Sequence, residues 1–275
     1  MSDDFAGDSR PGSAAPSATV MMVVQLAAYA IFALACAAGW LWGISENVVT
    51  VLALAALLTF VVAWPLRSDT VARVVAAIVG VASIVAAALP ADILGSSGEC
   101  IIIPETSLQA SSTGTCAADG ALALLGTAIS HWASTALVLL ALLIIGGFLR
   151  QMLREQRTEL VRSLSSFVLG GVTAVAAGAW VVTARVMRAL HDADALNVSA
   201  PLFASSSSTW YALGGLLIVV AVMVALAIVS CRWWRELLLG SNSSVRAAWL
   251  GFVLMPVLIF GLAAFAYAFA LVAMV

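Results

Sequence analysis

Residues 164–184 read LSSFVLGGVTAVAAGAWVVTA, and no charged side chain interrupts them. An α-helix needs about 20 apolar residues to cross the hydrocarbon core of a bilayer. Inside that core every backbone N–H and C=O group must be satisfied by the protein, and a helix does this within one segment. We therefore predict that this stretch is a transmembrane helix.

Six further stretches are also long and apolar, with no Asp, Glu or Arg in their interior. The seven predicted spans are Thr19–Trp42, Val48–Leu66, Val71–Leu89, Ser130–Leu149, Leu164–Ala184, Tyr211–Ser230 and Ala248–Val275. Continuously apolar runs favour helices, because strands of a membrane barrel would alternate. The predicted fold class is an all-α integral membrane protein, with seven transmembrane helices over residues 19–275. A disordered cytoplasmic tail is expected over residues 1–18.

The composition of the chain supports this class. Hydrophobic residues make up 63% of the chain and charged residues 9%, whereas soluble domains average roughly 45–50% and 25%. These values exclude a soluble domain, a disordered chain and a nucleic-acid binder. Every basic residue is arginine and Ala and Val are abundant, which indicates a GC-rich bacterial genome. We expect a multi-pass protein of the bacterial cell membrane.

The distribution of arginine predicts the orientation, because cytoplasmic loops of membrane proteins carry an excess of basic residues. With the N-terminus inside and the C-terminus outside, only Arg185 and Arg188 lie on the outer side. The inner arginines are then Arg10, Arg67, Arg73, Arg150, Arg154, Arg157, Arg162, Arg232, Arg235 and Arg246. This asymmetry favours the N-in, C-out topology.

Two predicted outer loops, about residues 90–120 and 191–210, are longer than a simple connection requires. The first contains Cys100 and Cys116. The arginine-based topology places this pair on the oxidising side of the membrane, where disulfides persist. We predict a disulfide that closes this outer loop; two free thiols and a metal or redox pair are the alternatives.

Small residues recur every four positions in the fifth predicted span, at Gly170, Ala174 and Gly178. Such a face lets helices approach closely. The third span repeats the pattern at Ala72, Ala76 and Gly80. The two faces are expected to pack against each other or against another subunit, including a second copy of the chain.

The outer arginines are the main candidate binding site. Arg185 and Arg188 share a helix face, and a planar guanidinium suits phosphate or carboxylate groups. His131, on the preceding span, is the third candidate ligand residue. The alternatives are a helix end with snorkelling arginines, with Asp192 pairing Arg188, and a neutral histidine bonded to a neighbouring hydroxyl or carbonyl group.

Residues 150–162 are expected to form a short cytoplasmic amphipathic connector. Its basic residues, which anionic lipids of the inner leaflet would attract, are Arg150, Arg154, Arg157 and Arg162. Docking of a partner protein to this connector is the alternative interpretation.

The sequence lacks the usual catalytic signatures, such as a phosphate-binding glycine loop or an HExxH motif. It indicates no catalytic residue, metal or cofactor. The leading hypothesis is a noncatalytic membrane protein, permease-like or an accessory subunit, that binds an amphiphilic or anionic ligand or a partner protein. The alternatives are an uncoupled facilitator of a small apolar or amphiphilic solute, and a membrane enzyme that acts on lipid-linked substrates.

The disulfide predicts a labelling pattern in intact cells. A membrane-impermeant maleimide should leave Cys100 and Cys116 unlabelled until a reducing agent is added, because the bonded sulfurs cannot react. Labelling of both thiols without reduction would exclude the disulfide.

Overall fold

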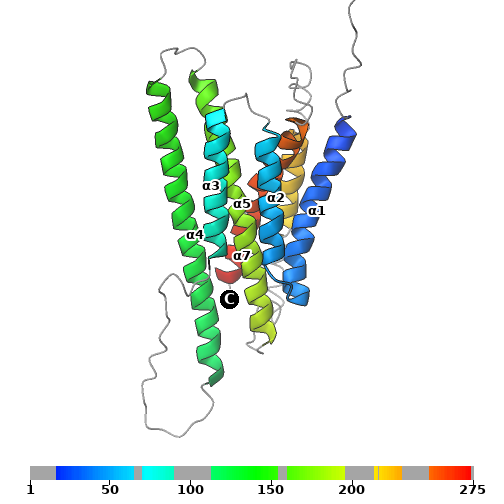
Figure 1. Ribbon diagram of the computed structural model, residues 1–275. Helices are drawn as coiled ribbons and strands as arrows, with labels where there is room; N and C mark the ends of the chain where they lie inside the picture. The colour runs from blue at the N-terminus through cyan, green and yellow to red at the C-terminus, as the bar shows by residue number, and fades with distance from the viewer. Residues whose placement is uncertain are drawn as a thin grey trace, which may run out of the picture.

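All regular structure in the described part of the chain is helical. The computed structural model describes residues 17–64, 70–89, 113–153, 160–195, 214–215, 217–230 and 248–273. Its helices are α1 (Ala18–Trp42), α2 (Asn47–Val62), α3 (Thr70–Ala88), α4 (Thr113–Met152), α5 (Leu160–Ala195), Leu217–Ser230 and α7 (Ala248–Ala273). The prediction of an all-helical protein is confirmed (Figure 1).

Five of these helices are long and apolar enough to cross a membrane, as a multi-pass membrane protein requires. Their spanning stretches are Thr19–Trp42, Thr70–Ala88, Ile129–Arg150, Leu164–Ala189 and Trp249–Ala270. Helix α2 and the helix Leu217–Ser230 are apolar but shorter than a full span. Helix α2 ends at Val62, before the predicted end at Leu66. In the sequence Pro65 lies between these two positions, and a proline disfavours helical geometry in the residue before it.

Three predicted boundaries need correction. Helix α4 begins at Thr113, inside the predicted outer loop 90–120, and α5 continues to Ala195, inside the predicted loop 191–210. Residues 150–152 of the predicted connector belong to α4 and residues 160–162 to α5, so its ends extend the two long helices instead of forming a separate one. Polar residues can continue a helix beyond the apolar core, and hydropathy therefore underestimates helix length.

Helix α5 is the central helix of the bundle. Of its spanning stretch 83% is buried, against 22% for α4, and it contacts α1, α2, α3, α4 and α7. The alanines at 174, 176, 177 and 179 are completely buried. In Figure 1, α5 is seen between α3 and α2, whereas α4 lies at the edge of the bundle beside α3.

The small-residue faces of α3 and α5 lie against each other. A Cβ atom added to Gly80 would lie 3.1 Å from the Ala174 Cβ atom, and one added to Gly178 would meet Ser83. The Ser83 hydroxyl donates to the Val175 carbonyl at 2.8 Å and accepts from the Trp132 indole at 3.2 Å. This hydroxyl links α3, α4 and α5 at the level of Gly178.

Further polar contacts hold the remaining helices together. The Trp180 indole donates to the Val257 carbonyl of α7 at 3.1 Å, and its ring stacks on Phe32 of α1 at a centroid separation of 4.8 Å. Two turns before Phe32 on the same face of α1, Gln25 Oε1 accepts from the Ser230 hydroxyl at 2.9 Å. Because lipid offers no partner to these groups, such bonds specify which helices pair.

The close contacts of Gly178 predict that two glycine-to-leucine variants differ in stability. Gly178→Leu should destabilise the protein by about 1–3 kcal/mol, because the added side chain collides with Ser83 and Trp132. Gly126→Leu is the matched control, since a Cβ atom there meets nothing within 4 Å. Thermal unfolding in detergent is the measurement, and equal melting temperatures for the two variants would contradict close packing at Gly178.

Candidate functional site

Three helix ends meet around the last turns of α5, at the lower end of the bundle in Figure 1. The C-terminal ends of α1 and α3 and the N-terminal end of α2 all contact side chains of α5 at this end. We call it the Arg185 end. It brings together the polar side chains Glu46, Arg185, Arg188 and His191.

Arg185 binds the C-terminal end of α3. Its Nη1 and Nη2 atoms donate to the carbonyl oxygens of Leu89 and Ala88 at 2.6 and 2.8 Å. The last carbonyl groups of a helix have no partner within that helix, and they carry the negative end of its dipole. Arg185 therefore satisfies two acceptors and places a positive charge where the α3 dipole favours it.

The third nitrogen of the same guanidinium group faces Glu46. Arg185 Nε and Glu46 Oε1 are 3.7 Å apart, and the side chains are 15% and 34% exposed. Glu46 is the N-cap residue of α2. Arg185 thus holds the ends of α2 and α3 against α5 with a single side chain.

Arg188 and His191 lie against the turn between α1 and α2. Gly43 ends α1 with a φ of 60°, a conformation in which glycine has no steric penalty. A Cβ atom added there would lie 2.9 Å from both Arg188 Nη1 and His191 Nε2. The backbone at Gly43 and the two side chains are therefore in close contact, and both side chains are partly buried.

His131 lies deeper in the bundle, on α4. Its carbonyl group accepts from the Thr135 hydroxyl at 2.9 Å, and its Nδ1 atom is buried without a hydrogen-bond partner. The neighbouring Trp132 bonds Ser83, five residues before Ala88. At a rise of 1.5 Å per residue, this level is about 7.5 Å further into the bundle than the Arg185 contact.

The structure thus groups the predicted residues differently from the prediction. Arg185 and Arg188 lie on one face at the same end of α5, as predicted, but the histidine beside Arg188 is His191 and not His131. The alternative interpretation, a helix end with snorkelling arginines, placed Arg185 at the C-terminal end of its own helix. In the structure α5 continues for ten residues beyond Arg185. The helix whose C-terminal end Arg185 caps is α3.

Sequence reasoning missed Glu46, Gly43 and His191. Glu46 was detectable in principle, since it is a carboxylate in a short turn that the predicted topology places on the side of Arg185. The role of His191 depends on α5 continuing past Ala184, and hydropathy does not reveal that.

Other predicted sites are placed only in part. Cys100 lies outside the described residues, as do Arg154 and Arg157. Cys116 and Arg162 are described only as backbone of α4 and α5. Cys36 is a buried free cysteine in α1. Among the described residues, no group of three His, Cys, Asp or Glu side chains is placed to hold a metal ion.

Compared with known protein families, curated proteins and solved structures, the chain matches none.

The contacts of Arg185 predict a graded loss of stability. Arg185→Gln should lower the free energy of unfolding by about 1–3 kcal/mol, because the α3 carbonyl groups lose charged donors. Glu46→Gln should cost less than about 1 kcal/mol, since that ion pair is long and partly exposed. Thermal unfolding of both variants tests the order, and a larger loss for Glu46→Gln would contradict the capping role.

Proposed function

We propose that this chain is a noncatalytic multi-pass protein of a bacterial cell membrane that binds an anionic, amphiphilic ligand at its outer face. In this role it serves as a permease-like or accessory subunit. The observation that supports the proposal is the grouping of Arg185, Arg188 and His191 around Gly43 and Glu46. The arginine distribution supports an outer location for this end.

The charges of the cluster favour an anion. Two guanidinium groups and an imidazole share one carboxylate, Glu46, among the side chains that the structure describes at this end. Both guanidinium groups lie at the end of the bundle that the arginine distribution assigns to the outer side. Guanidinium groups bind phosphate and carboxylate oxygens with paired hydrogen bonds.

The amphiphilic character of the ligand follows from the end of α1. Trp42, next to Gly43, is 73% exposed, and Trp40 and Leu41 are also exposed. Aromatic side chains favour the interface between membrane and water. A ligand with an acidic group at the arginines can therefore lay its apolar part along the end of α1.

The bundle interior supports a noncatalytic role without ion coupling. The buried polar side chains of the described residues are neutral: Gln25, Ser83, Thr173, Thr183 and Ser230. Each bonds to the backbone or to another side chain. Ion-coupled transporters usually place ionisable groups within the membrane, whereas the described arginines and His131 lie near the ends of the apolar spanning stretches.

Binding of glycerol phosphate, a headgroup analogue without an acyl chain, tests the proposal. Calorimetry on the purified full chain should show binding that weakens at least tenfold in Arg188→Gln. Glu46→Gln should strengthen binding, because the competing carboxylate is gone.

Thr59→Val is the control, since Thr59 is an exposed, uncharged residue near the opposite end of α2, and the affinity should stay unchanged. Equal affinities in the wild type, Arg188→Gln and Glu46→Gln would show that the cluster only joins helices.

A further inference from the structure

An apolar groove runs between α3 and α4 at the end of the bundle opposite Arg185. Its volume is about 690 Å³, within the range of pockets that hold small ligands. The α3 wall is formed by Val71, Val75 and Val79. The α4 wall includes Leu142, Gly146 and Leu149. Phe167 of α5 also lines it.

The groove has the length of one membrane leaflet. From Leu142 to Leu153 the α4 wall rises about 16 Å at 1.5 Å per residue. Half of a typical hydrocarbon core is about 15 Å. The groove therefore reaches from the level of the headgroups to about the middle of the bilayer, which is the depth that one lipid acyl chain occupies.

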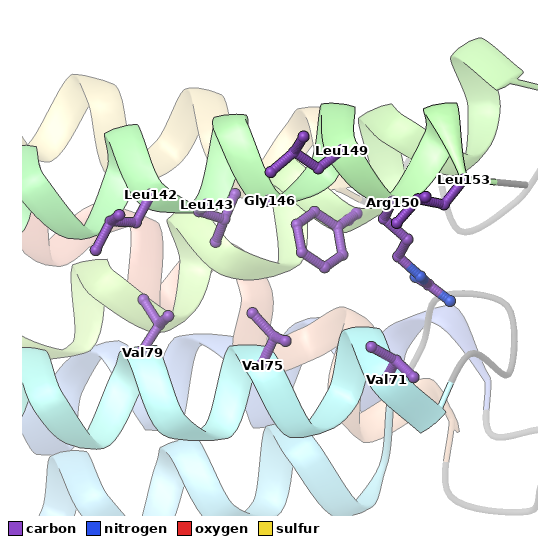
Figure 2. A pocket seen from close by; sticks show the side chains of 10 residues that line it. Val71, Val75, Val79, Leu142, Leu143, Gly146, Leu149, Arg150 and Leu153 are labelled. Carbon is purple, nitrogen blue, oxygen red and sulfur yellow. The ribbon is translucent and has the colours of Figure 1, made fainter.

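Arg150 gives the groove one polar end. It is the only charged residue among the lining residues, and Figure 2 shows its side chain extending from α4 toward the Val71 end of α3. It lies at the last residue of the spanning stretch Ile129–Arg150, where a lipid phosphate group is expected. An apolar channel that ends at a guanidinium group complements an anionic lipid.

We propose that this groove binds one anionic phospholipid of the adjacent leaflet, with an acyl chain between α3 and α4 and the phosphate group at Arg150. Gly146 contributes no side chain to the α4 wall. A Cβ atom added to Gly146 meets nothing within 4 Å, so a leucine at this lining position is expected to extend into the groove.

Lipid retention tests the proposal. The full-length protein is reconstituted in nanodiscs of equal parts phosphatidylglycerol and phosphatidylcholine, released, and analysed by native mass spectrometry. The wild type should retain one phosphatidylglycerol molecule. Gly146→Leu should reduce retention of both lipids at least fivefold, whereas Arg150→Gln should mainly remove the preference for phosphatidylglycerol, by about fivefold.

Gly126→Leu is the matched control on the same helix, because its added side chain also meets open space but lies outside the groove. It should retain lipid like the wild type. Leu142→Phe narrows the groove from an exposed position and provides a second variant if Gly146→Leu fails to fold. Unchanged retention in a folded Gly146→Leu or Leu142→Phe protein would overturn the proposal. Cross-linking of two chains through this face with unchanged lipid retention would also overturn it, in favour of a dimer interface.

Discussion

The close approach of α5 to its neighbours is the contact on which the rest of the bundle depends. Lipid chains are as apolar as protein side chains, so the hydrophobic effect does not drive one membrane helix against another. The stability of a helix surrounded by other helices therefore depends on dense packing and on a few polar bonds. The small side chains at Gly80, Ala174 and Gly178 allow that density. They also explain why α5 is buried while α4, which carries larger aliphatic residues, faces outward.

Polar groups then determine how the helices pair. Ser83 joins α3, α4 and α5, Trp180 joins α5 to α7, and Gln25 joins α1 to the helix Leu217–Ser230. Each of these groups would be costly to bury alone. At the Arg185 end the same requirement applies to backbone, because the last carbonyl groups of α3 need donors, and Arg185 of α5 supplies them.

The sequence predicted what depends on local hydropathy and spacing, and it missed what depends on contacts distant in the chain. Residues 164–184 indicated a membrane helix, and their small-residue pattern anticipated the Gly80–Ala174 contact. The ends of α4 and α5 were misplaced because Thr113 and Ala195 lie in polar stretches that hydropathy assigns to loops. Pairing of Arg185 with the α3 carbonyl groups joins residues 96 and 97 positions apart, and no spacing rule reveals such a pair.

The fold also gives a reason why Arg185 lies on the predicted outer side, where arginines are otherwise rare. Basic residues on the predicted outer side oppose the topological bias, so their presence requires a compensating benefit. For Arg185 the benefit is structural, since it caps α3 and faces Glu46. Arg188 lies one turn further along α5, where its guanidinium group lies beside Gly43. The helix face that caps α3 therefore also carries a second guanidinium group, and the proposed anionic ligand would be recognised at this face.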